Sequence, residues 1–122
     1  MSLYEYRAIV TKAYDGDTIT VDVDLGWNVW LREQGLRLNR INAPELKTDV
    51  GGPEAQAALE ALTPIGSELI IKTMKDKEDK YGRMLAEIYL ASDQLRLRNV
   101  NDQMVKLGFA VYWDGKGKRP LK

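Results

Sequence analysis

The segment that most restricts the fold is residues 18–25, in which polar and apolar side chains alternate without a fault. This period of two is that of a β-strand with one buried face. The Asp15-Gly16 dipeptide before it readily adopts hairpin turn geometry, so residues 6–14 are predicted to pair with this strand. The apolar side chains of the second strand are expected to point into a core: Ile19, Val21, Val23 and Leu25.

Three further segments are rich in strand-forming residues and complete a set of five predicted strands. Residues 28–41 form one long strand that is interrupted near Gly35, and residues 68–74 and 83–90 form the last two. Five strands are the number found in a small barrel.

Two segments have helical character. Residues 53–62 begin with a proline and a glutamate, both favourable in a first helical turn, and continue through alanine and leucine. A second helix is predicted to end at Lys106 before Gly108, with either Asn99 or Asn101 as its N-cap.

The order of elements is three strands, a helix, two strands and a helix. That order predicts a mainly β fold with helices, the five-stranded Greek-key barrel called the OB-fold, with one helix between strands three and four and one near the C-terminus. The chain has 122 residues, enough to bury about two-thirds of its unfolded surface in one core. We expect residues 1–122 to form a single domain, because no linker or repeat divides them.

Composition removes several kinds of chemistry. The chain has no cysteine and no histidine, which excludes disulfides, thiolate nucleophiles, Ser-His catalysis and His-ligated zinc. No apolar run approaches the roughly 20 residues of a membrane span, and no signal peptide is recognisable. The sequence predicts a cytoplasmic protein without a membrane partner, with secretion after signal removal as the alternative.

Charge is balanced overall but not along the chain. Residues 1–60 hold 6 Lys+Arg against 10 Asp+Glu, a balance of −4, and residues 61–122 hold 12 against 8, a balance of +4. An acidic half suits a cation, and a basic half suits phosphate groups.

Several polar side chains stand where they can carry chemistry. Asp17 lies at the mouth of the predicted hairpin, where its carboxylate can accept a hard cation, although the same residues also make an ordinary turn. Arg37 and Arg83 have planar guanidinium groups whose donors suit phosphate oxygens. Taken by itself, each is also what an exposed strand residue would look like. Glu45 follows Pro44, which fixes the local backbone and so could hold the carboxylate in place. Taken by itself, Glu45 is also what a solvated loop residue would look like.

Four clusters together resemble the staphylococcal nuclease, or thermonuclease-like, family. The resemblance runs from about Arg7 to Tyr112, with the pieces in family order. The clusters are DGDT at 15–18, RLNRINAPE at 37–45, DKYGRMLAEIY at 79–89, and VN at 100–101 followed by Val105 and Gly108.

The resemblance implies a role for each matching residue. Asp17 matches a calcium ligand, and Ala43 a residue that offers its backbone carbonyl to the metal. Arg37 and Arg83 match catalytic arginines that bind the scissile phosphate and stabilise the transition state. Glu45 matches the glutamate that orients or deprotonates the attacking water.

Two further positions complete the predicted site. Lys80 and Tyr81 match residues near the nucleotide phosphate. Asn42 departs from the family pattern, which expects an aspartate that gives calcium a second carboxylate. Calcium affinities in proteins span roughly 10⁻⁹ to 10⁻³ M largely through ligand charge and rigidity, so Asn42 is expected to weaken binding.

The first functional hypothesis is a calcium-dependent nuclease that hydrolyses DNA or RNA. The alternative is a non-catalytic, nuclease-like OB module that binds single-stranded nucleic acid or a protein partner. In a third reading, Mg2+ or another divalent ion takes the place of Ca2+. The register of Tyr112 and Trp113 against a base-contacting tyrosine stays open, and Trp27 and Trp30 receive no function.

Overall fold

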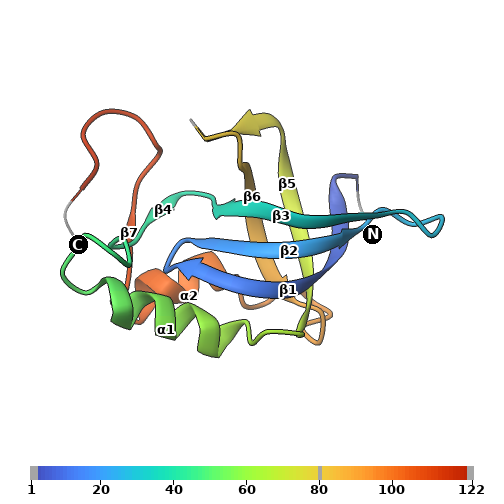
Figure 1. The fold of residues 1–122 in the computed structure, drawn as a ribbon, viewed down its shortest axis with the longest axis horizontal. Helices are drawn as coiled ribbons and strands as arrows, with labels where there is room; N and C mark the ends of the chain where they lie inside the picture. Colours follow the sequence, from blue (N-terminus) through green and yellow to red (C-terminus); the bar gives the residue numbers. More distant parts are fainter. Residues whose placement is uncertain (1–2, 80, 121–122) are drawn as a thin grey trace.

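A closed β-barrel forms the body of the protein. The computed structural model describes residues 3–79 and 81–120, and within these ranges five strands close in the order β1-β2-β3-β6-β5 (Figure 1). All neighbouring pairs are antiparallel except β3 and β6. This confirms the predicted OB-like, mainly β fold. The barrel strands are β1 (Glu5–Asp15), β2 (Thr18–Asp24), β3 (Trp30–Leu38), β5 (Glu68–Glu78) and β6 (Met84–Leu90).

The long strand predicted over 28–41 is two strands. The predicted interruption near Gly35 is wrong, since Gly35 pairs with Thr20 inside β3. The break comes at Arg40, whose φ of 72° lies in the left-handed region and turns the chain out of the barrel wall. Beyond it, β4 (Ile41–Asn42) pairs with β7 (Val111–Tyr112), so the C-terminal segment lies beside the end of β3.

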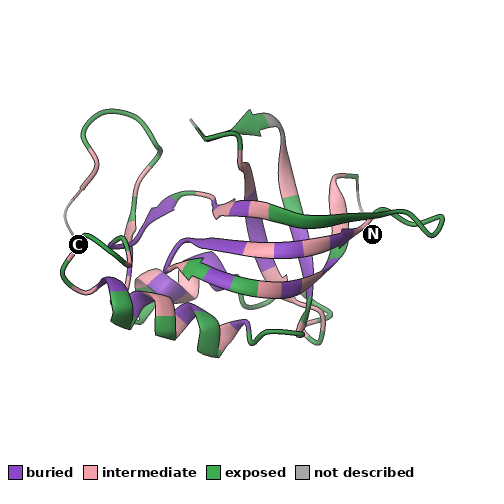
Figure 2. Cartoon of the chain, in the orientation of Figure 1, coloured by how far each residue is buried: buried purple, intermediate pink, exposed green. Residues whose placement is uncertain are grey.

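The inward face of β2 follows the predicted alternation as far as the strand extends. Ile19 and Val21 are fully buried and Val23 is nearly so, and Figure 2 shows the buried residues along the barrel strands. Leu25 was expected inside and is instead 43% exposed. The reason is that β2 ends at Asp24, whose carboxylate accepts a hydrogen bond of 2.8 Å from Gly26 N and turns the chain away.

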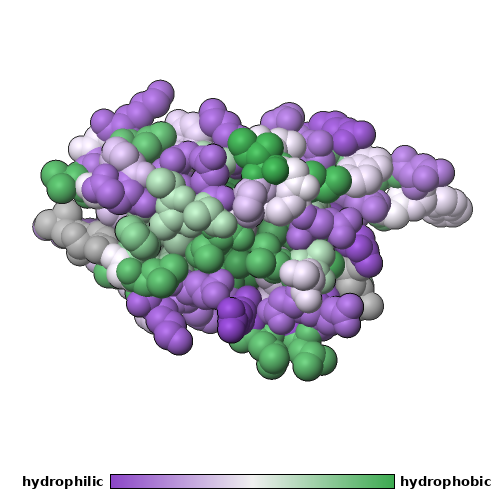
Figure 3. All heavy atoms as spheres, turned by 90° about the horizontal axis from the view of Figure 1, so that it is seen from below, coloured by the Kyte–Doolittle hydropathy of each residue, from purple (hydrophilic) through white to green (hydrophobic). Residues whose placement is uncertain are grey.

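Helix α1 (Gly52–Leu62) packs against β1 and confirms the first predicted helix. Ala55 and Leu59 form its buried face, and Gln56 Nε2 donates to the Ala13 carbonyl at 2.9 Å. Figure 3 shows the molecule from below, the side on which α1 lies, with hydrophobic side chains gathered near the centre and at the lower edge among hydrophilic ones. No helix in the described ranges is long and apolar enough to cross a membrane.

Helix α2 (Val100–Lys106) confirms the second predicted helix and decides its cap. Asn99 is the N-cap, because its side chain accepts from Asp102 N at 3.0 Å. Asn101 is fully buried, and its amide nitrogen donates to the carbonyls of Asn39 and Ala86 while its oxygen accepts from Ile88 N. Asn101 therefore joins α2 to the barrel instead of capping the helix.

A second polar link holds the β3–β4 turn. Glu87 on β6 accepts hydrogen bonds from Asn39, from two nitrogens of Arg40 and from Asn99, at 2.7 to 3.0 Å. Burial alone would raise the pKa of Glu87, but the hydrogen bonds from Arg40, Asn99 and Asn39 outweigh it, so that the pKa is lowered. The ionised form of Glu87 is thus the one that the fold stabilises.

We predict that Glu87→Gln flattens the dependence of stability on pH. Because the folded state lowers the pKa, the stabilisation is complete above the ordinary value of 4.5 and disappears as pH falls through the folded value. At neutral pH the variant should lose about 2 kcal/mol of unfolding free energy, measured by urea denaturation. Glu54→Gln on α1 is the control, and equal acid sensitivity of Glu87→Gln and the unmodified protein would contradict the assignment.

Candidate functional site

A cleft of about 760 Å3 opens at one end of the barrel. Its walls come from the β1–β2 turn, the end of β3 with β4, the end of β5 with residues 79, 81 and 83, and the segment after β7. Lys80, predicted to bind substrate, lies outside the described residues. The other predicted site residues all line this cleft: Asp17, Arg37, Asn42, Ala43, Glu45, Tyr81 and Arg83.

Asp17 is buried at the cleft and fixed by several contacts. It is only 6% exposed, its Oδ2 accepts from Ala43 N at 2.8 Å, and its Oδ1 accepts from the Thr18 hydroxyl at 3.0 Å. Gly16 allows this close approach, because a Cβ there would lie 2.6 Å from the Ala55 Cβ and 2.9 Å from that of Ala43. The hairpin turn is thereby pressed against both α1 and the segment that follows β4.

Arg37 shares the Asp17 carboxylate. Its Nη1 lies 2.8 Å from Asp17 Oδ2, and its Nη2 donates to Asn42 Oδ1 at 3.4 Å. The Arg37 side chain is 13% exposed, so most of this pair is shielded from water. Removing one member of such a pair leaves an uncompensated charge, which costs about 3–5 kcal/mol. Arg37 is therefore held at the cleft wall in one orientation.

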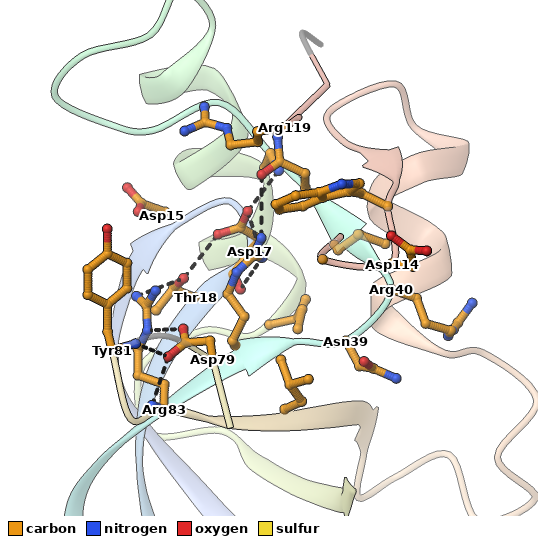
Figure 4. A pocket seen from close by; sticks show the side chains of 18 of the residues that line it. Asp15, Asp17, Thr18, Asn39, Arg40, Asp79, Tyr81, Arg83, Asp114 and Arg119 are labelled. Atoms are coloured by element: carbon orange, nitrogen blue, oxygen red, sulfur yellow. Dashed lines mark hydrogen bonds and ion pairs between the residues drawn. The ribbon is translucent and has the colours of Figure 1, made fainter. Parts of the chain in front are cut away.

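Arg83 is held by a different acid. Its Nε lies 2.6 Å from Asp79 Oδ2, and its Nη1 donates to the Thr18 hydroxyl at 3.4 Å (Figure 4). Burial alone would raise the pKa of Asp79, but hydrogen bonds from Arg83 and Tyr81 outweigh it and lower the pKa. The guanidinium carbon of Arg83 lies 5.2 Å from the centre of the exposed Tyr81 ring. Thr18 thus links the Asp17 group to the Arg83 group.

Glu45 lies at the rim and has a cationic partner. Its Oε1 lies 2.7 Å from Arg119 Nη1, its Oε2 accepts from the Thr48 hydroxyl at 2.9 Å, and Arg119 also pairs with Asp49. Sequence reasoning did not assign Arg119 to the site. The sequence signals only that a guanidinium prefers carboxylates. It does not show which carboxylates Arg119 contacts, because Glu45 and Asp49 are 74 and 70 residues away in the chain.

Asn42 uses both ends of its amide. Its oxygen faces Arg37, and its Nδ2 donates to the Pro120 carbonyl at 3.3 Å. An aspartate at this position has no donor for that carbonyl. Asn42, where the family resemblance predicts an aspartate, therefore also contacts the C-terminal segment.

Asp15 is a second acid that sequence reasoning did not assign to the site. It lines the cleft, and its Oδ1 accepts from Leu46 N at 2.9 Å. Burial raises the pKa of Asp15, and the hydrogen bond from Leu46 offsets only part of that effect.

The proposed ligand atoms are of the type that a hard divalent cation binds, but together they carry little negative charge. Asp17, the Asn42 amide and the Ala43 carbonyl offer only oxygens, as Ca2+ and Mg2+ require. Among these three, Asp17 alone is charged, and its carboxylate is already shared with Arg37. Within the described ranges no group of three or more acidic residues is placed to hold a metal ion.

The aromatic residues whose role the sequence left open differ in whether they line the cleft. Trp113 lines the cleft, whereas the Tyr112 hydroxyl donates to Asp102 on α2 at 2.9 Å. Trp27 is 97% exposed at the tip of the β2–β3 hairpin, and the Trp30 ring stacks with Arg32 at 5.0 Å. Neither of these two tryptophans lines the cleft.

An OB-like barrel with arginines, carboxylates and backbone carbonyls around one terminal cleft has the residue types of a phosphate-binding site. The family model described as staphylococcal nuclease homologue matches residues 35–120, and the chain belongs to that family. The chain is also 29% identical over 116 residues to Endonuclease YhcR of Bacillus subtilis (strain 168). That alignment covers 87% of this chain but only 9% of the relative's length.

Proposed function

We propose that this chain hydrolyses phosphodiester bonds of single-stranded or denatured DNA and of RNA, with Ca2+ as the first candidate cation. Membership of the staphylococcal nuclease family and the similarity to an endonuclease support the reaction class. The observation that carries the proposal is that Arg37 and Arg83 lie in one cleft with Asp17 and Glu45.

The two arginines would bind the scissile phosphate. Each has one side engaged by a carboxylate, Arg37 by Asp17 and Arg83 by Asp79, which fixes the direction of the guanidinium fork. Pre-oriented donors cost no reorganisation when negative charge builds up on the phosphate oxygens in the transition state. Asp79 acts as a positioning residue in this scheme, and Asp17 both orients Arg37 and is a proposed ligand of the cation.

Asp17, Asn42 and Ala43 would hold the cation, with Asp17 as the only formal charge. A bound divalent ion supplies neutralisation of phosphate charge and a lower pKa for water. Because the protein contributes so little charge, phosphate oxygens of the substrate would complete the coordination sphere, as at many Mg2+ sites. Binding of cation and of substrate would then be strongly interdependent.

Glu45 would accept the proton of the attacking water. As the structure stands, one of its oxygens contacts Arg119 and the other Thr48. Movement of Arg119 toward substrate phosphate would release Glu45 for this role.

The alternative is a nuclease-like module that binds nucleic acid without cleaving it. Two observations favour it: the uncharged Asn42, and the ion pair that Arg119 makes with Glu45. The retained set of Asp17, Arg37 and Arg83 favours the enzyme, because binding alone does not need this combination.

We predict chelator-sensitive cleavage of heat-denatured DNA by the purified protein. Arg37→Ala and Arg83→Ala should each lower the rate by about 10²- to 10³-fold, since each removes one donor to the transition state. Arg32→Ala, on an exposed strand away from the cleft, is the matched control. Thermal melting identifies variants that fail to fold. DNA that is bound but stays intact with every divalent ion would establish the non-catalytic module instead.

We predict that Asn42→Asp strengthens calcium binding by at least about ten-fold and raises turnover, because it adds a second carboxylate. Calorimetric titration measures the first effect and initial rates the second. Gln94→Glu, at an exposed position outside the cleft, controls for added charge alone. Absence of any gain in affinity or rate would show that position 42 does not contact the cation.

We predict that Arg119→Ala raises the rate constant of cleavage a few-fold, because a carboxylate relieved of a cationic neighbour accepts a proton more readily. Lys118→Ala removes the same charge from the same segment and should leave the rate constant unchanged. A lower rate constant for Arg119→Ala would instead assign Arg119 to phosphate binding.

A further inference from the structure

A second, shallow groove lies beside α2, on the other side of the Asn39–Arg40 turn from the cleft. It runs between β5 and β6 on one side and the 96–107 segment on the other. We call it the α2 groove. Among the residues that line it, five are basic and two acidic, a balance of 5 − 2 = +3: Arg40, Lys72, Arg96, Arg98 and Lys106 against Glu87 and Asp102.

The two acids of the α2 groove are both occupied by the same arginine. Arg40 Nη2 lies 2.7 Å from Glu87 Oε1, and Arg40 Nη1 lies 3.0 Å from Asp102 Oδ1. The single charge of Arg40 balances one of these two acids, and Arg96 pairs with Glu5 at 3.8 Å, so the remaining cations of the α2 groove still outnumber the remaining acid. Lys72, Arg98 and Lys106 are exposed, and among the described side chains none of them has an ion-pair partner.

The loop that carries Arg98 is held in shape before any ligand arrives. The Asp93 carboxylate accepts from Leu97 N at 3.1 Å and from Arg98 N at 2.8 Å, and the Asp93 carbonyl accepts from Arg96 N at 3.1 Å. Arg96 takes a φ of 58° at this bend. A preorganised loop loses less conformational entropy when it binds, which favours affinity.

The α2 groove also offers an aromatic surface. Tyr89 on β6 lines it half-buried, and its hydroxyl accepts from Asn99 Nδ2 at 3.3 Å. Grooves that bind single-stranded nucleic acid combine basic side chains along the backbone with aromatic rings on which bases stack. Unpaired cations around a fixed tyrosine match that combination better than they match a purely apolar partner.

The α2 groove and the cleft are contiguous. Asn39 and Arg40 line both, and the Glu87 hydrogen bonds hold this turn in place. A strand whose phosphate occupies the cleft therefore reaches the groove by crossing a single turn of backbone.

We propose that the α2 groove binds the phosphate backbone of the single-stranded nucleic acid that extends beyond the cleft. Lys72, Arg98 and Lys106 contact its phosphates, and Tyr89 supports a base. The proposal deepens the function proposed above and rests on it for the identity of the ligand. It predicts that longer strands bind more tightly than short ones.

The test is fluorescence anisotropy of labelled oligothymidylate in chelator, so that no strand is cut. Strands of about 4 and about 16 nucleotides are compared, the range covered by one OB-fold. The groove variant combines Lys72→Ala, Arg98→Ala and Lys106→Ala. The control variant combines Arg7→Ala, Lys12→Ala and Arg32→Ala, which removes the same charge from residues that line neither site.

The groove variant should bind the long strand at least about ten-fold more weakly, with a salt slope smaller by roughly 2, as expected for three lost phosphate contacts on a single strand. Its affinity for the short strand and the long-strand affinity of the control variant should stay within about two-fold of the unmodified protein.

Equal losses in the groove and control variants, equal losses for both lengths, or no loss at all would each overturn the proposal. Because binding is measured without hydrolysis, a protein that cleaves nothing can still pass this test. A protein that cleaves normally can likewise fail it, so the two proposals fail separately.

Discussion

The bond between the Asp17 carboxylate and the Ala43 backbone is the contact on which the site depends. It joins the β1–β2 turn to the segment after β4, and the same carboxylate pairs with Arg37 on β3. Three parts of the chain that are distant in sequence are thus fixed by one buried acid. Gly16 makes the contact possible, since any side chain there would collide with α1. The barrel holds these segments together, and the Asp17 carboxylate fixes the position of the Arg37 guanidinium group in the cleft.

The arrangement has a consequence for charge. The two acids that contact the proposed catalytic arginines are paired, Asp17 with Arg37 and Asp79 with Arg83, while Asn42 brings an amide where the family resemblance predicts a carboxylate. The two arginines are therefore held in fixed orientations, and the three proposed cation ligands bring a single formal charge between them. Such a site favours an anionic ligand over a lone cation, and it makes phosphate the natural partner for any divalent ion that enters. The same amide contacts the C-terminal segment through Pro120, and Arg119 from that segment reaches Glu45, so the C-terminal segment contacts the cleft at two points.

Sequence alone predicted the barrel, both helices and the cluster of residues around the cleft. It succeeded where local period and capping chemistry dominate, as in β2 and at the Asn99 cap. It failed at the end of β3, which depends on one backbone angle. Arg40 adopts a left-handed conformation there, and no glycine or proline in the sequence signals the break. Leu25 was misplaced because the strand ended one residue earlier than its pattern. Arg119 and Asp15 were missed because their partners come from remote segments, which no local pattern reveals.

The central claim is that the protein provides too little charge to hold a cation by itself and that nucleic acid supplies the rest. Calorimetric titration of Ca2+ into the protein, with and without a single-stranded phosphorothioate oligonucleotide that keeps its charge and resists hydrolysis, tests this claim most directly. The account predicts weak binding, near the 10⁻³ M end of the protein range, for the protein alone and binding at least about ten-fold tighter with the oligonucleotide present. Tight binding without the oligonucleotide, or an affinity that the oligonucleotide leaves unchanged, would contradict it.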